Sequence, residues 1–298
     1  LMAKTLPKTK LQEVTIKGYK SIAFNNPVTL KLNDVSILLG ANGAGKSNVI
    51  SFFRMLSYMM SKSFGKYVEI SGASNALLHY GAKKTPIMSG EIKFSDSKSI
   101  DTYSFSLSNA TPDRLIITEE RIMWHRKGEV KPYEENLEPV FKESALAESS
   151  NPVAKTIFQM LSYCKVYQFH DSSTEGPLRQ VCPVETTNYL QSHGNNLPSF
   201  LLYLRDNYTN SYNRIVDYVR DVVPQFQDFY LEPNNRFISL RWEDNSATDY
   251  RFNAYQFSDG SIRFIALATL LLQPPQTMPK AIILDEPELG LHPYAITQ

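Results

Sequence analysis

Hydrophobic and polar residues alternate along the chain with periods that predict where strands and helices lie. Residues 14–16 and 28–32 alternate with a period of two on either side of the polar turn 25–27, which predicts two paired strands. Residues 35–39 are apolar except for one serine, as expected for a strand buried on both faces of a parallel sheet. A glycine-rich stretch then leads into a predicted helix over 46–60, so the order is strand, glycine loop, helix.

The rest of the chain changes between strand-like and helix-like patterns. Short alternating segments from residue 90 to residue 124 are separated by polar and proline clusters, which predicts an antiparallel meander. Residues 126–152 are charged and have little periodicity, so they predict a surface loop. No heptad repeat is long enough for a coiled-coil arm. The remaining predictions are helices over 153–163, within 197–223 and over 262–272, and strands over 166–169, 229–231, 237–242, 250–255 and 281–284.

The glycine-rich stretch carries a phosphate-binding motif. Residues 40–47 read Gly-Ala-Asn-Gly-Ala-Gly-Lys-Ser, which satisfies the pattern G-x-x-x-x-G-K-[ST]. In such a loop the backbone N–H groups surround a phosphate, Lys46 reaches the β and γ phosphates, and the Ser47 hydroxyl is a magnesium ligand. The motif therefore predicts binding of ATP with Mg²⁺. The predicted nucleotide-binding residues here are Asn42, Gly43, Ala44, Gly45, Lys46, Ser47 and Asn48.

A pair of acidic residues follows the last predicted strand. Asp285 and Glu286 come directly after residues 281–284, at the end of a parallel strand, where open α/β sheets bind their ligands. In that position Asp285 is predicted to hold the magnesium ion through a water molecule, and Glu286 to act as general base toward the attacking water. The alternative is a strand end with two surface acids, and the phosphate-binding motif favours the catalytic interpretation.

A third candidate element stands where the helix near residue 260 is predicted to begin. Ser258 offers a hydroxyl, and Gly260 a backbone N–H, to an anion at the helix N-terminus. Taken alone, the same residues are typical of an ordinary helix N-cap. The anion-binding interpretation is favoured only because the phosphate-binding motif and the acidic pair are also present.

In this order the motifs resemble the ABC-type ATPase heads of the RecF and SMC group, and most closely the short bacterial ATPases of the AAA-21 class. Residues 16–21 resemble the opening strand motif of the group, 258–261 its signature motif, and 285–293 the Walker B motif running into the D-loop. The resemblance implies an α/β fold, a P-loop NTPase head with an antiparallel β lobe and an inserted helical lobe. It divides one composite ATPase domain into 11–170 with the P-loop and the meander, 171–256 as a helical and β insertion, and 257–298 with the signature helix and Walker B motif.

The resemblance also implies an ATP-dependent homodimer. In this group two heads enclose two ATP molecules, and the signature motif of one protomer contacts the γ-phosphate bound by the other. Ser258 and Gly260 are therefore expected to act in trans. Lys20 and Ser21 are expected to lie near the nucleotide, and residues 288–291 to line the dimer seam.

The residue expected to sense the magnesium ion is less sharply marked. Gln168, after the predicted strand, is the candidate metal contact and catalytic residue, with His170 as its alternative. A buried polar side chain with a purely local partner is the competing interpretation.

The chain departs from the group at two points. Asp259 stands at the second signature position, where transporters carry glycine, which argues against a transporter ATPase. The chain also ends soon after the D-loop, whereas the group continues with further strands and a switch histidine, a role that His292 does not fill. We therefore expect a C-terminal part of the fold to be missing.

Composition limits the binding partners and the cellular compartment that are expected for the chain. The 298 residues carry 31 Lys and Arg against 30 Asp and Glu, so the net charge of +1 excludes a histone-like surface that coats polyanions. Two cysteines are too few for a disulfide framework and no apolar run is long enough to span a bilayer, so we expect a cytoplasmic protein without a membrane partner. DNA stays open as a partner, because the lysines that support it are equally typical of a solvated basic face. These lysines are Lys4, Lys8, Lys10, Lys17, Lys20, Lys83 and Lys84.

The favoured function is an ATP-binding and hydrolysing ABC-type ATPase whose head dimerisation regulates a DNA-related or antiphage-defence effector. The chain itself has no nuclease pattern, so the effector, a nuclease or a toxin, is expected to be a separate subunit or a missing C-terminal part. The homodimer is also compatible with a higher oligomer. The alternative is a low-turnover ATP-binding scaffold that holds the effector inactive. A small-molecule kinase comes third, because a kinase needs no signature motif.

Overall fold

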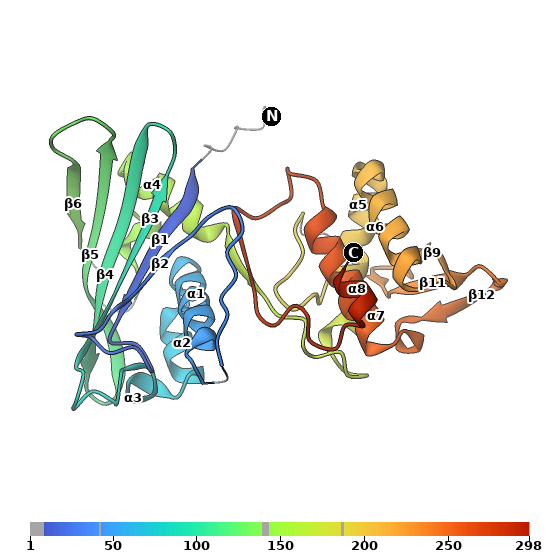
Figure 1. The fold of residues 1–298 in the computed structure, drawn as a ribbon, viewed down its shortest axis with the longest axis horizontal. Coiled ribbons are helices and arrows are strands. Elements are labelled where there is room, and N and C mark those ends of the chain that lie inside the picture. Colours follow the sequence, from blue (N-terminus) through green and yellow to red (C-terminus); the bar gives the residue numbers. More distant parts are fainter. Residues whose placement is uncertain (1–8, 42, 139–142, 186–187, 298) are drawn as a thin grey trace. The chain divides into compact units, whose positions relative to one another are not determined.

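The chain folds into two compact units in a computed structural model that describes residues 9–41, 43–138, 143–185 and 188–297 (Figure 1). Unit 1 comprises Leu1–Lys165 and Lys280–Ile283, and unit 2 comprises Val166–Pro279 and Leu284–Gln298. The chain therefore passes between the units three times. The predicted boundaries after residues 170 and 256 both fall inside unit 2, and the three-part division stays a prediction.

Unit 1 is built on a six-stranded sheet in the order β2-β1-β3-β4-β5-β6. Every neighbouring pair in this sheet is antiparallel, which confirms the predicted meander and the predicted N-terminal strand pair. The strands are β1 (Lys10–Lys17), β2 (Val28–Lys31), β3 (Ile87–Ser95), β4 (Ser99–Ala110), β5 (Arg114–Arg126) and β6 (Tyr133–Leu137).

The prediction of an irregular loop over 126–152 is wrong in part. It contains β6 and the short 3-10 helix η1 (Ala145–Ala147). β6 is a polar edge strand that pairs with β5 from Trp124 opposite Tyr133 to Glu120 opposite Leu137. β6 is stabilised by its pairing with β5 and not by an apolar face of its own. The hydrophobic pattern of its sequence therefore did not predict a strand.

The helices of unit 1 pack on one face of the sheet, as Figure 1 shows for α1 and α2. α1 begins at Lys46 and ends at Met60, as predicted. Its buried Phe52 stacks on Phe105 of β4, with 6.1 Å between ring centroids, and this contact joins the helix to the centre of the sheet. The other helices are α2 (Phe64–Ile70), α3 (Ala73–Leu77) and α4 (Pro152–Ser162).

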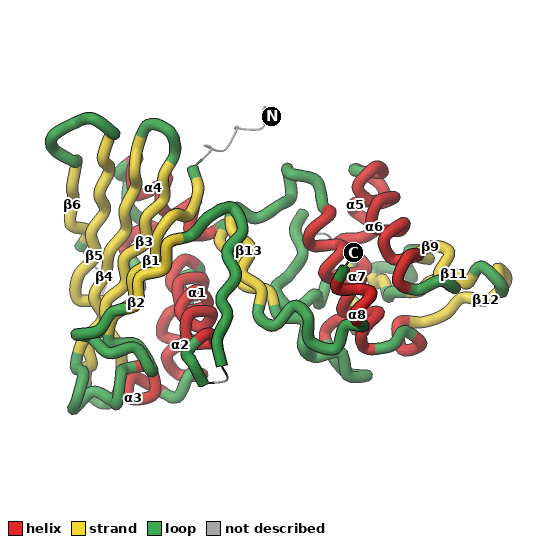
Figure 2. Tube along the Cα trace, viewed as in Figure 1, coloured by secondary structure: helices red, strands yellow, loops and turns green. Residues whose placement is uncertain are grey.

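The segment before α1 is not the buried strand that its apolar sequence predicts. Residues 35–39 form a loop in the structure (Figure 2), and Val35, Ile37 and Leu39 are 80%, 76% and 89% exposed. A parallel strand needs neighbouring strands to satisfy its backbone and cover both faces. Among the described residues no strand pairs with this segment, so the prediction is wrong here.

Asp101 lies on the core side of β4, between buried positions that include Tyr103, and makes stability depend on pH. Burial, and less strongly the charge of Asp96, raises the pKa of the Asp101 carboxyl from 3.8 to about 6. The folded state therefore favours the protonated form, and the cost of ionisation appears as the pH rises from 3.8 through 6.

We expect Asp101→Asn to raise the free energy of unfolding by about 1–2 kcal/mol near pH 7.5, because the amide removes the cost of the buried charge and water screens part of it. The gain is expected to vanish near pH 4, where the wild-type carboxyl is protonated. Urea unfolding at the two pH values measures the difference, and an equal gain at both would contradict the explanation.

Unit 2 combines helices with a small antiparallel sheet in the order β12-β11-β9. One face of this sheet carries an aromatic cluster, in which Trp242 stacks on Phe252 at 4.6 Å and on Phe257 at 4.8 Å between ring centroids. The helices predicted within 197–223 and over 262–272 are confirmed. The elements are α5 (Leu197–Asn207), α6 (Thr209–Val222), α7 (Asp259–Leu272), β8 (Cys182–Pro183), β9 (Phe226–Tyr230), β10 (Phe237–Ile238), β11 (Arg241–Asp244), β12 (Ala247–Asn253) and α8 (Pro293–Ile296), with the 3-10 helices η2 (Pro177–Arg179) and η3 (Ala254–Gln256).

Strands β7 (Cys164–Tyr167) and β13 (Ala281–Leu284) form a two-stranded sheet. The amide of Lys280 donates to the carbonyl of Tyr163 at 3.0 Å, and that of Asp285 to Tyr167 at 3.5 Å, so the strands run in the same direction. The parallel strand predicted over 281–284 is confirmed, and the one predicted over 166–169 lies two residues earlier. Both strands therefore deliver the residues that follow them to the same edge.

The helices are short in the part of the chain that the structure describes. The longest, α1, has 15 residues, which agrees with the predicted lack of a coiled-coil arm. Within the described ranges no helix combines the length and the apolar character needed to cross a bilayer.

Candidate functional site

The phosphate-binding motif forms a loop that leads into α1. Gly43 and Gly45 have φ angles of +84° and +96°, a region that glycine adopts readily, and Gly45 is the N-cap of the helix. The ammonium of Lys46 turns back onto the loop and donates to the carbonyls of Gly40 and of Ala41, the latter at 3.1 Å. Asn42, another predicted nucleotide-binding residue, lies outside the described residues.

The start of α1 has the properties of a phosphate site. Its N-cap glycine provides no side-chain acceptor, and its first turn contains no acidic residue. The exposed Ser47 lies in that first turn. The positive end of the helix dipole is therefore not neutralised by a cap or by an acid of its own turn, so the loop is suited to bind a phosphate group.

A tight turn after β1 brings Lys20 and Ser21 to the start of α1. Lys20 has a φ of 51°, its amide donates to the carbonyl of Leu77 at 2.8 Å, and its carbonyl accepts from His79 Nδ1 at 2.7 Å. Asn48 Nδ2 donates to the Ser21 Oγ at 2.6 Å. The structure therefore places the predicted residues Lys20, Ser21 and Asn48 together in unit 1.

A group of hydroxyls holds this turn against the side of α1. The Lys20 ammonium donates to Ser51 Oγ at 3.0 Å, and the Tyr19 hydroxyl lies 3.0 Å from that same oxygen and 2.9 Å from the Tyr67 hydroxyl. Burial, and less strongly the charge of Arg54, lowers the pKa of the Lys20 ammonium. The lysine is therefore held by packing beside the loop rather than free in solvent.

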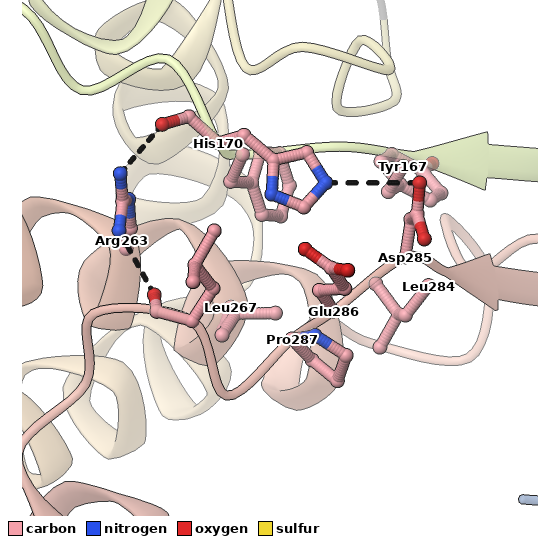
Figure 3. A pocket seen from close by; sticks show the side chains of 10 residues that line it. Tyr167, His170, Arg263, Leu267, Leu284, Asp285, Glu286 and Pro287 are labelled. Atoms are coloured by element: carbon pink, nitrogen blue, oxygen red, sulfur yellow. Dashed lines mark hydrogen bonds and ion pairs between the residues drawn. The ribbon is translucent and has the colours of Figure 1, made fainter. Parts of the chain in front are cut away.

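Gln168 and Asp285 meet at the edge where β7 and β13 end. Gln168 Nε2 donates to Asp285 Oδ2 at 2.7 Å. His170 Nε2 lies 3.8 Å from the same oxygen, and Figure 3 shows this pair. The sequence left Gln168 and His170 as alternatives, and both approach Asp285, with Gln168 the closer. Their roles toward a metal ion stay predictions.

Glu286 occupies a small pocket beside this pair. The pocket has His170, Asp285 and Glu286 on its polar side and Leu267 and Pro287 among its apolar walls. Figure 3 shows the Glu286 carboxylate turned toward the His170 ring. Glu286 has a φ of 44°, a strained conformation for a non-glycine residue and one that is frequent at functional sites. The predicted role of Glu286 as general base stays a prediction.

The predicted signature motif forms the N-terminus of α7. Ser258 is the N-cap, and its Oγ accepts from the amide of Ser261 at 3.1 Å, so the N-cap interpretation is confirmed. Gly260 lies in the first turn of the same helix. The expected contact of Ser258 and Gly260 with a nucleotide in trans stays a prediction.

Sequence reasoning missed a buried arginine beneath this helix start. Arg179 is 5% exposed, and its Nη2 donates to the carbonyl of Phe257 at 3.2 Å and to Asp259 Oδ1 at 2.9 Å. Other guanidinium nitrogens donate to the carbonyls of Ser172, at 2.9 Å, and of Ala254. Arg179 is about 80 residues before α7 and belongs to no motif, so no pattern in the sequence marks it.

A second arginine, Arg263 of α7, joins two loops of unit 2. Its Nη2 donates to the carbonyl of His170 at 2.6 Å, and its Nη1 to the carbonyl of Leu289 at 2.9 Å (Figure 3). The guanidinium thus links the segment after β7 to the segment after Glu286.

The candidate ligands for a metal ion are single side chains and do not form a cluster. Within the described ranges no group of three or more His, Cys, Asp or Glu side chains is arranged to hold a metal ion. Mg²⁺ is commonly bound by one or two protein oxygens together with substrate phosphates, which suits Ser47 and Asp285. Ser47 belongs to unit 1 and Asp285 to unit 2, so their joint use stays a prediction.

Comparison with known families matches the C-terminal part of the chain. Residues 175–298 match the AAA_21 family, described as "AAA domain, putative AbiEii toxin, Type IV TA system". This confirms the predicted resemblance for the segment that contains α7, Asp285 and Glu286, whereas the phosphate-binding motif at 40–47 precedes the matched residues. No curated protein matches the chain.

Proposed function

We propose that this chain is a magnesium-dependent ATPase whose ATP-driven dimerisation regulates a separate effector. The observation that carries the proposal is the contact of Gln168 with Asp285, at 2.7 Å, at the ends of two parallel strands and directly before Glu286. Asp285 and Glu286 lie within the segment that matches the AAA domain, and the motif at 40–47 adds a phosphate-binding loop.

The loop at the start of α1 binds the phosphates. Backbone N–H groups between Gly43 and Ser47 donate to phosphate oxygens, which the uncapped helix end favours. The Lys46 ammonium exchanges the carbonyls of Gly40 and Ala41 for the same phosphates, so it keeps hydrogen-bond partners in both states.

Residues at the ends of β7 and β13 serve hydrolysis. Ser47 and Asp285 are the proposed ligands of Mg²⁺, which neutralises phosphate charge when bound. Gln168 fixes the Asp285 carboxylate through the hydrogen bond that already joins them. Glu286 accepts a proton from the water that attacks the γ-phosphate.

The N-terminus of α7 closes the site of a second copy. Ser258 and the amide of Gly260 donate to the γ-phosphate held by the partner protomer. A ligand that moves an equilibrium from almost all open to almost all closed must favour the closed state by about 5.5 kcal/mol, and charge-assisted contacts to a triphosphate supply energies of that order. ATP then favours the dimer, and hydrolysis releases it.

The effector is a separate subunit in this proposal. The family description names a putative toxin and a type IV toxin–antitoxin system, which supports a toxin as the partner. A nuclease as the partner, and a role in antiphage defence or a DNA-related process, rest on the resemblance of the motifs alone. DNA is a second candidate partner, and the dimer is open to higher assembly.

Mass in solution tests the proposal. We expect ATP with Mg²⁺ to double the mass of the wild-type chain measured by light scattering. Lys46→Ala is expected to abolish the doubling because it weakens phosphate binding. Ser258→Arg is expected to abolish it while leaving the binding of a fluorescent ATP analogue unchanged.

Ser150→Arg, a matched change at an exposed loop serine, is expected to dimerise like the wild type. A mass that is the same with and without ATP would contradict ATP-driven dimerisation. A doubled mass of the Ser258→Arg variant with ATP would show that the start of α7 does not lie in the dimer interface.

A further inference from the structure

The start of α7 carries an acidic residue where an incoming phosphate needs positive potential. Asp259 is the first residue of the helix, and its side chain is 65% exposed. A carboxylate in a first turn stabilises the helix dipole, but it also repels a phosphate that approaches the same amides. The proposed contact of Ser258 with the partner's γ-phosphate therefore requires that this charge be compensated.

Arg179 provides the compensating charge from inside the protein. Its Nη2 lies 2.9 Å from Asp259 Oδ1, while the rest of the guanidinium is buried. A buried cation is costly unless an anion or several acceptors surround it. Asp259 is the anion that pairs with the Arg179 guanidinium. The two charges thus stabilise each other, and the helix start gains no net negative charge.

The same guanidinium also fixes the backbone on both sides of Ser258. Nη2 donates to the carbonyl of Phe257, directly before Ser258, and to the carboxylate of Asp259, directly after it. The planar guanidinium holds these acceptors in a fixed geometry that a lysine ammonium does not impose. Ser258 is therefore held between two residues that share one anchor.

We propose that Arg179 is a positioning residue for the α7 helix start: it neutralises Asp259 and fixes the backbone around Ser258, so that this turn accepts the γ-phosphate of a second copy. The inference rests on the proposed function. It gives a reason for aspartate at the second signature position, because a buried arginine is present to pair with it.

A double-mutant cycle tests the proposal through the ATP concentration that gives half-maximal dimerisation. We expect Arg179→Met to raise this concentration about 10–100-fold, because the free Asp259 carboxylate then repels the phosphate. Asp259→Asn is expected to change it less than about threefold. The double variant is expected to recover at least about tenfold relative to Arg179→Met, since the repelling charge is gone.

Two further measurements separate charge from folding. The effect of Arg179→Met is expected to shrink as salt is raised, as it should for repulsion between exposed charges. If Arg179→Met does not fold, Arg179→Gln replaces it, because its amide still donates to the backbone carbonyls without the positive charge. Binding of a fluorescent ATP analogue is expected to stay within about twofold of the wild type in every folded variant.

The outcomes distinguish this inference from the proposed function. A double variant no better than the Arg179 single variant would overturn the neutralising role. A wild-type chain that binds ATP but does not dimerise would overturn the proposed function, and this inference with it. Dimerisation in the wild type without recovery in the double variant overturns the neutralising role of Arg179 and leaves the proposed function standing.

Discussion

Glu286→Gln is expected to lower the rate of ATP hydrolysis by about 10²–10⁴-fold, the usual contribution of a general base, while ATP still binds. The carboxylate follows Asp285 directly and faces the pocket beside β13. Glutamine has nearly the same shape but its amide does not accept the proton of the attacking water. Phosphate release at saturating ATP measures the rate, and a fluorescent analogue measures binding.

Glu138→Gln is the matched control, because it makes the same chemical change at an exposed position after β6, outside the proposed site and the proposed dimer seam. It is expected to change the rate less than about threefold, within the range of ordinary surface substitutions. We also expect the Glu286→Gln dimer to persist with ATP, since hydrolysis no longer releases it. Unchanged hydrolysis in Glu286→Gln would show that another residue is the general base. A wild type with almost no hydrolysis would favour the scaffold alternative.

Gly18→Ala is expected to lower the free energy of unfolding of unit 1 by about 3 kcal/mol or more, from backbone strain and overpacking together. Gly18 has a φ of +70°, and a Cβ there would lie 2.6 Å from the carbonyl oxygen of Ile87. That oxygen belongs to β3, so neither atom can move without shifting a strand. The Gly18 carbonyl also accepts from the amide of His79 at 3.0 Å, so the Lys20 turn is expected to loosen.

Gly128→Ala separates the two costs. Gly128 has a φ of +93°, but a Cβ there would meet nothing within 4 Å. The variant therefore carries only the left-handed backbone penalty, about 1–2 kcal/mol. Urea unfolding of both variants gives the difference, which is the cost of the contact with β3. Equal losses in the two variants would show that the strand accommodates the methyl group.

Short-range patterns were sufficient where the local sequence determines the element. The helix that begins at Lys46 was predicted to the residue, because a glycine motif and an apolar face both mark it. Residues 35–39 failed for the opposite reason, since their apolar side chains report what a strand would bury but not whether neighbouring strands are present. β6 was missed because it depends on pairing with β5.

The candidate site divides in the same way. Lys46, Asp285 and Glu286 stand in motifs whose chemistry requires those residue types, so the sequence was enough to find them. Arg179 and Arg263 act through backbone carbonyls, which any residue supplies, and such contacts leave no pattern in the sequence. Tertiary structure was needed to find them.

The aromatic cluster of unit 2 places a tryptophan where its fluorescence can report on the start of α7. The chain has two tryptophans, and Trp242 is buried against Phe257, the residue directly before Ser258. Trp124 belongs to unit 1, so Trp124→Phe leaves a single tryptophan, and that tryptophan packs against Phe257 at the helix start. Its emission would then follow the arrival and departure of a second copy in real time, without any attached dye.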